Sequence, residues 1–231
     1  PPNPAANLVL PKATEGSHRA ITDQERVAIL QLAERHPAGL WVKVMLYCGL
    51  RPGETAALCW RHLDLNAGVL HVEQAVTAKV NTIGAPKSRA GIRTIPIPAP
   101  LLDDLRQRQG APDDFLFSQP TTGNHHTKAS LRCYWKSFKR ALDIQMGALV
   151  YRNQIVQSVV AKDLSPYCLR HTYCTDLQSA GVPINVAREL MGHSSIELTA
   201  RIYTHSSQTA LQRAATSINQ FHSSVISTDI L

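Results

Sequence analysis

Five side chains suited to the chemistry of phosphate esters stand at defined points of this 231-residue sequence. They are Arg51, Lys87, Arg170, His193 and Tyr203. Attack on a phosphodiester adds negative charge to its nonbridging oxygens, so catalysis depends mainly on positioning and electrostatic stabilisation. An arginine offers paired hydrogen bonds to those oxygens and keeps its charge at physiological pH. A tyrosine hydroxyl with cationic neighbours can act as a nucleophile and form a covalent intermediate.

Each of these residue types, taken alone, also has an ordinary structural explanation. An arginine is often a surface group or one half of an ion pair, and a tyrosine at helical spacing is often part of the core. A lone histidine beside a helix break can be a cap or a satisfied core group. The elements that position these residues, and the order of their motifs, therefore decide between the explanations.

The first two helices are marked by their boundaries. Thr22 and Glu25 form a T-x-x-E capping box, which opens a helix that we expect to stop near Pro37. Residues 40–46 are apolar nearly all round. We therefore expect a deeply buried second helix, which Gly49 ends.

A third helix start holds the first arginine. Pro52 suits the first position of a helix that we expect to run through Trp60, which fixes Arg51 at its start. Residues 69–77 and 92–97 alternate between apolar and polar side chains. These two stretches are expected to pair as a β-hairpin.

The second half of the chain is expected to be mostly helical. Residues 115–117 are a short strand candidate, and 130–142 form a helix with one apolar and one basic side. Ser165 caps a helix that starts at Pro166 and ends at Gly181, and residues 183–192 form the next. A capping box at 194–197, with Ser194 as the cap, opens the helix that carries Tyr203.

Composition agrees with one main globular domain. Apolar residues make up 44% and charged residues 18% of the chain, which excludes disordered and fibrous classes. Together with the expected elements, this predicts a mainly α fold with a small antiparallel β-sheet, in the α+β class. The net charge of +7 and pI near 9.4 favour a polyanionic partner, although a basic enzyme indifferent to DNA remains open on charge alone.

Cysteine usage and hydropathy indicate a cytoplasmic protein. The five cysteines are an odd number and lie mostly in apolar or helical contexts, which is typical of reduced, buried thiols. No apolar run approaches the roughly 20 residues that span a bilayer, so we expect no membrane partner. Residues 1–17 are expected to be a linker, 18–205 the main domain and 206–231 a helical tail.

The motifs around the five side chains follow a familiar order. They are Gly49-Leu50-Arg51-Pro52-Gly53-Glu54, Pro86-Lys87-Ser88 with Arg93-Thr94-Ile95-Pro96, Leu169-Arg170-His171-Thr172, Met191-Gly192-His193 and Tyr203-Thr204-His205. Each piece alone is weak, but five in order at these intervals are strong. From about residue 20 to 205 the sequence resembles the catalytic domain of the tyrosine recombinases, the phage and conjugative-transposon integrases.

The resemblance implies a DNA breaking-and-rejoining fold and a role for each side chain. Tyr203 would attack the phosphodiester and form a 3′-phosphotyrosyl bond, which preserves the bond energy so that rejoining needs no ATP. Arg51 and Arg170 would clamp the phosphate, Lys87 would protonate the departing 5′ oxygen, and His193 would hydrogen-bond the transition state or assist proton movement. No metal or other cofactor is implied.

One position departs from the family's pattern. The family usually has His or Lys three residues before the second arginine, and this chain has Tyr167. A phenol can donate a hydrogen bond to phosphate but is a poor acid or base near neutral pH. Tyr167 is therefore expected to be a site residue with an altered role, and Glu54 and His171 are expected to orient neighbouring groups.

Two strips rich in cations and free of acids are candidate contacts to double-stranded DNA. They comprise Lys79, Arg89 and Arg93 beside Lys87, and Lys128, Arg132, Lys136, Lys139 and Arg140. Part of the second strip repeats every four residues and should form one ridge on its helix. The alternative is a solvated helix face without a partner.

The resemblance also implies assembly. In proteins of this type, the catalytic domain commonly follows an upstream DNA-binding domain. The proteins commonly act as tetramers on DNA, and each protomer passes a C-terminal tail to a neighbouring protomer. Docking of residues 206–231 in trans is therefore expected, with docking against the chain's own core as the alternative.

Three other functions compete with a recombinase. A type IB topoisomerase shares the same chemistry, and a noncatalytic DNA-binding protein could keep the fold. A metalloenzyme would use a cluster of histidines and cysteines. Its candidates are Cys168, His171, Cys174, His125 and His126. Cys168 and Cys174 project in different directions on a helix, which is awkward for one metal.

Overall fold

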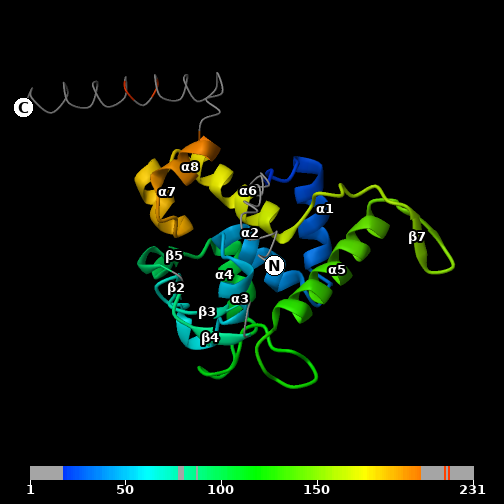
Figure 1. The fold of residues 1–231 in the computed structure, drawn as a ribbon, viewed down its shortest axis with the longest axis horizontal. Helices are drawn as coiled ribbons and strands as arrows, with labels where there is room; N and C mark the ends of the chain where they lie inside the picture. The colour runs from blue at the N-terminus through cyan, green and yellow to red at the C-terminus, as the bar shows by residue number, and fades with distance from the viewer. Residues whose placement is uncertain (1–17, 78–80, 87, 204–215, 217, 219–231) are drawn as a thin grey trace, which may run out of the picture.

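The structure is a computed structural model that describes residues 18–77, 81–86 and 88–203, with 216 and 218. The linker expected at 1–17, nearly all of the tail expected at 206–231, and the candidates Lys79 and Lys87 lie outside the described residues. Figure 1 shows the helices and three small β-sheets of the described part. The expected class, mainly α with small antiparallel sheets, is confirmed.

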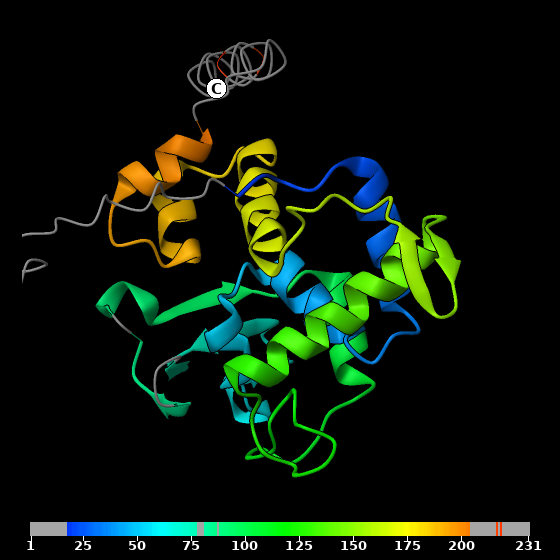
Figure 2. The ribbon, with the colours of Figure 1, turned by 45° about the vertical axis from the view of Figure 1, so that its right-hand side comes forward.

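The core is built around one helix that is buried on nearly every side. It is α2 (Gly39–Cys48), whose Trp41, Val44 and Leu46 are fully enclosed. It packs against α1 (Asp23–Ala33) and α6 (Pro166–Ser179), and Figure 2 shows α2 passing between α6 and the sheets. The sequence prediction of a deeply buried second helix is confirmed.

The expected helix boundaries around this core are also confirmed. The Thr22 side chain and the Glu25 carboxylate form the reciprocal capping box that opens α1. Gly49 ends α2 in the left-handed conformation, with φ of 61°. A Cβ atom at this position would lie 2.1 Å from the ring of Tyr173, so both the backbone angle and the close approach require glycine.

Two expectations about residues 52–62 and 115–117 were wrong. The helix that starts at Pro52, α3 (Pro52–Ala56), ends well before Trp60. The chain after it turns through the 3-10 helix η1 (Trp60–His62). The N–H groups of residues 60 and 61 donate to the carbonyls of residues 114 and 112, and the N–H of residue 116 donates to the carbonyl of residue 58. The segment 115–117 makes one isolated bridge, between Cys59 and Phe115, and is not a strand. Because the backbone groups of residues 58–61 hydrogen-bond to residues 112–116, they do not form the hydrogen bonds that would extend the helix.

The predicted pairing of two alternating stretches is confirmed, with one subdivision. Strand β2 (Val69–Val72) pairs antiparallel with β5 (Arg93–Pro96), and β1 (Leu63–Asp64) adds to the other edge of β2. Residues 75–77 belong to a separate hairpin of β3 (Ala75–Thr77) and β4 (Thr82–Gly84). The 3-10 helix η2 (Arg89–Gly91) leads from that hairpin into β5.

Two helices and one β-hairpin lie between β5 and α6 in the sequence. Helix α4 (Ala99–Arg106) was not predicted, whereas α5 (Lys128–Gln145) contains the predicted helix. A hairpin of β6 (Leu149–Tyr151) and β7 (Gln154–Gln157), also not predicted, projects from the body in Figure 1.

The last two described helices follow the predicted stops. Helix α7 (Ile184–Met191) ends at left-handed Gly192, and α8 (Ile196–Tyr203) follows. The hydroxyl of Ser195, rather than that of Ser194, accepts from the Glu197 backbone N–H, which corrects the expected cap. Four of the five cysteines are buried and Cys133 is exposed, all without a disulfide. Within the described residues, no helix is long and apolar enough to cross a membrane.

Candidate active site

A buried carboxylate gathers two arginines at the start of α3. Glu54 is 3% exposed and accepts a hydrogen bond from the Arg51 backbone N–H at 2.8 Å and from Arg51 Nη1 at 2.8 Å. From β5, Arg93 donates to both oxygens of the same carboxylate, at 3.1 and 2.9 Å. Burial alone raises the pKa of Glu54, but the hydrogen bonds and charge of Arg93 outweigh it and hold that pKa at about 2. Glu54 is therefore ionised at neutral pH.

The third arginine is buried without a carboxylate of its own. Arg170, on α6, is 5% exposed and donates to the backbone carbonyls of Gly49 and Met191. Burial and then the charge of Arg51 lower the pKa of Arg170 to about 9, which leaves the guanidinium protonated at neutral pH. Arg170 thus lies near Arg51, at the ends of α2 and α7, and the role of the two arginines as a phosphate clamp stays a prediction.

Three consecutive carbonyls at the C-terminal end of α7 each accept from a different arginine. The pairs are Arg93 Nε to Leu190 O at 2.7 Å, Arg170 Nη2 to Met191 O, and Arg51 Nη2 to Gly192 O at 2.9 Å. Gly192 has φ of 62°, and a Cβ there would lie 2.9 Å from Arg93 Nη1. The three guanidiniums thus fix the turn that carries His193.

His193 is a neutral imidazole directly beside this cationic group. Its Nδ1 shares a hydrogen bond of 3.0 Å with the hydroxyl of Thr199, a fully buried residue of α8. Burial, followed by the charges of Arg170 and Arg51, lowers the pKa of His193 to about 4. At neutral pH the ring is therefore uncharged, and its low pKa makes it a weak proton acceptor that can still form hydrogen bonds.

Two expected catalytic residues cannot be placed as side chains. The backbone of Tyr203 closes α8, one turn beyond Thr199. The Tyr203 side chain and Lys87 lie outside the part of the chain that the structure describes. Their roles stay predictions.

Tyr167 faces the site from the start of α6. It is 44% exposed, and its ring stacks on that of His18 with centroids 5.1 Å apart. It lines a hollow of about 390 Å³ together with Arg51 and Glu54. His171 is half-buried, and burial followed by the charge of His18 lowers its pKa. The expected duties of Tyr167 and His171 remain untested.

Two residues that we expected to contact DNA, Arg93 and Lys139, instead hydrogen-bond within the protein, which corrects those expectations. The side chain of Arg93 is 4% exposed because it points inward from β5 to Glu54. Lys139 donates from Nζ to the carbonyls of Ala161, Lys162 and Leu164, at 2.9 to 3.1 Å, and so holds the loop before α6. The burial of Arg93 had a signal in the sequence, because strict alternation from Ile95 places residue 93 on the inner face.

The other candidate contacts lie nearer the surface. Arg140 is half-buried and hydrogen-bonds the carbonyl and side chain of Asn153, in the turn of the β6–β7 hairpin. The exposed candidates are Arg89, Lys128, Arg132 and Lys136. Among the described residues, no group of three or more His, Cys, Asp or Glu side chains is placed to hold a metal ion.

The fold and site define a class of protein. The model of the phage integrase family matches residues 19–210, and the chain belongs to that family. It is 28% identical to the prophage integrase IntR of Escherichia coli K12, over 76% of this chain and 44% of the relative. It is also 28% identical to the tyrosine recombinase XerC of Xylella fastidiosa M23, over 88% of this chain and 61% of the relative. The chain thus spans less than two thirds of either relative.

Solved structures show the same fold. The Tn1549 transposon integrase in complex with transposon right end DNA matches with a TM-score of 0.69 and 21% identity, over 90% of this chain and 68% of that one. The catalytic domain of bacteriophage HP1 integrase matches with a TM-score of 0.52 and 22% identity, over 87% and 95% of the two chains. The catalytic fold expected from the resemblance is confirmed.

Proposed function

We propose that this chain is the catalytic domain of a site-specific DNA recombinase, an integrase or excisionase of a mobile element, that cuts and rejoins strands through Tyr203. One observation carries the proposal. Arg51, Arg93 and Arg170 converge on one turn, and Glu54 is the one carboxylate within the described residues that pairs with them. The three positive guanidinium charges exceed the single negative charge of Glu54 by two. A phosphodiester attacked by a phenolate carries two negative charges, which this excess matches.

The proposed reaction combines this charge pattern with the residue roles that the resemblance to the family implies. The Tyr203 oxygen attacks phosphorus, the bond from phosphorus to the 5′ oxygen breaks, and a 3′-phosphotyrosyl bond forms. Neutral His193 assists the transfer of the phenolic proton to solvent, and Lys87 supplies a proton to the departing 5′ oxygen. Attack by a 5′ hydroxyl reverses these steps, so the strands rejoin without ATP or a metal ion.

The proposed substrate is double-stranded DNA. The exposed cations Lys128, Arg132 and Lys136 follow one another at four-residue spacing on α5, which suits a row of phosphates. Complexes of the Tn1549 transposon integrase and the XerH recombinase with DNA support the same partner. By the same likeness, we propose assembly as a tetramer on DNA in the cytoplasm, with residues 206–231 docked on a neighbouring protomer.

Trapping of a covalent complex on DNA tests the proposal. A nicked duplex that releases a short strand after cleavage is incubated with the protein in EDTA. We expect a covalent protein–DNA band that disappears in Tyr203→Phe and falls sharply in Arg170→Lys. A band that needs added metal, or no band with the parent protein, would refute the mechanism. Relaxation of supercoiled plasmid without strand exchange would instead identify a topoisomerase.

A further inference from the structure

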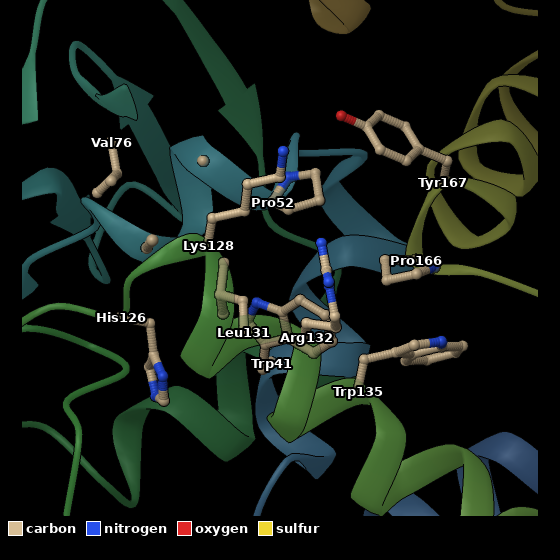
Figure 3. A pocket seen from close by; sticks show the side chains of 12 residues that line it. Trp41, Pro52, Val76, His126, Lys128, Leu131, Arg132, Trp135, Pro166 and Tyr167 are labelled. Carbon is tan, nitrogen blue, oxygen red and sulfur yellow. The ribbon is translucent and has the colours of Figure 1, made fainter. Parts of the chain in front are cut away.

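A second hollow adjoins the arginine site, and we call it the Trp41–Trp135 pocket. It has a volume of about 280 Å³ and lies between the first turns of α3, α5 and α6 (Figure 3). Its apolar walls are Trp41, Pro52, Ala56, Leu131, Trp135 and Pro166. Ligand pockets of about 300 Å³ and more hold drug-sized molecules, so this one suits a single small group such as a nucleobase.

The pocket and the arginine site share a wall. Gly53, Val76 and Tyr167 line both the Trp41–Trp135 pocket and the hollow that contains Arg51 and Glu54. A group bound in the pocket therefore lies next to a phosphate held by Arg51. On a DNA strand, the groups next to one phosphate are the sugar, base and phosphate of the adjacent nucleotide.

The rim of the pocket is cationic. Lys128 and Arg132 stand one turn apart on α5, both exposed, and within the described residues neither makes an ion pair. Figure 3 shows both side chains rising from α5 toward the opening, with the Tyr167 hydroxyl directed toward it from α6. An apolar interior with unpaired cations at its mouth suits a ligand that is both flat and anionic. An apolar protein segment would leave both charges without a partner.

We propose that the Trp41–Trp135 pocket receives one unstacked nucleotide of the bound DNA, adjacent to the phosphate at the arginine site. The base enters the apolar interior, and a neighbouring phosphate lies between Lys128 and Arg132. Removing a base from the stack costs a few kcal/mol, and the cost is least where the base is already unpaired. The inference rests on the proposed function, because the nucleotide is part of the DNA substrate.

The test compares two duplexes of identical sequence, one fully paired and one with a single unpaired thymidine. Binding is measured by fluorescence anisotropy with the whole chain. We expect the parent protein to bind the bulged duplex about tenfold more tightly, because part of the unstacking cost, about 1.4 kcal/mol, is already met. Ala56→Leu fills the pocket and should abolish this preference while the paired duplex still binds.

A second variant and a matched control keep the test independent of folding. The double variant Lys128→Gln and Arg132→Gln alters exposed side chains alone and should also lose the preference for the bulge. Lys136→Gln removes a charge from the next turn of α5, outside the pocket, and should weaken both duplexes equally.

The contrary outcomes separate the two proposals. Equal affinity of the parent protein for both duplexes, or a preference that survives in Ala56→Leu and in the glutamine pair, would overturn the pocket and leave the recombinase intact. Failure to bind either duplex would overturn both.

Discussion

Replacement of Arg93 by Met tests how the arginine site is held together. The change removes a guanidinium that is 4% exposed and leaves Glu54, 3% exposed, with Arg51 as its remaining cationic partner. Removing one partner of a buried ion pair costs about 3 to 5 kcal/mol. A domain of this size loses roughly 2 to 4 °C in Tm per kcal/mol, so we expect a fall of roughly 6 to 20 °C.

The effect on cleavage should exceed the effect on folding. Arg93 also holds the Leu190 carbonyl, so its loss frees one of the three anchors of the turn before His193. Misplacement of a catalytic group by about 1 Å can cost about a hundredfold in rate, and we expect a loss of roughly ten- to a hundredfold. Formation of the covalent complex is measured on nicked DNA well below the lowered Tm.

Two companion variants separate charge from geometry. Arg93→Lys keeps the charge but cannot reach Glu54 and the Leu190 carbonyl together, so stability should recover more than cleavage. The double variant Arg93→Met and Glu54→Gln removes the uncompensated charge and should regain stability without regaining activity.

The pKa of His193 provides a second measurement, which a loss of stability alone would not change. Arg93 is among the charges that lower the pKa of His193, after burial, Arg170 and Arg51. That pKa, followed by NMR, should therefore rise in Arg93→Met. A Tm within a degree or two of the parent protein, or an unchanged His193 titration, would refute this account of Arg93.

Three further predictions concern the same site and the DNA surface. The pKa of Glu54 is depressed to about 2, so its stabilising effect is complete above its unfolded pKa near 4.5 and is lost as pH falls toward 2. Glu54→Gln should therefore flatten the acid limb of Tm against pH, and an unchanged limb would contradict the pairing. Gly192→Ala should lower both Tm and cleavage, because φ is 62° and the new methyl meets Arg93; cleavage at the parent rate would show that the turn tolerates displacement. Arg132→Ala with Lys136→Ala should lower the salt dependence of DNA binding by about two charges, and an equal slope would remove α5 from the DNA surface.

Much of the site's framework is readable from local sequence because its signals act over three or four residues. The capping box of Thr22 and Glu25, the proline at position 52 and the glycines at 49 and 192 each determine a helix boundary through their own backbone or a near neighbour. The order of the motifs then indicated the arginine pair and His193.

Alternation along β5 indicates that residue 93 points inward, but only the tertiary structure decided which groups the buried charges meet. Arg93 meets Glu54 across 39 positions and the Leu190 carbonyl across 97, and Lys139 meets carbonyls more than 20 residues away. A sequence shows that a residue is cationic, but whether its charge meets solvent, DNA or a buried carboxylate depends on what the fold brings opposite it. The cost of burying an unpaired charge then selects the arrangement in which Glu54 and five backbone carbonyls accept hydrogen bonds from the three guanidiniums.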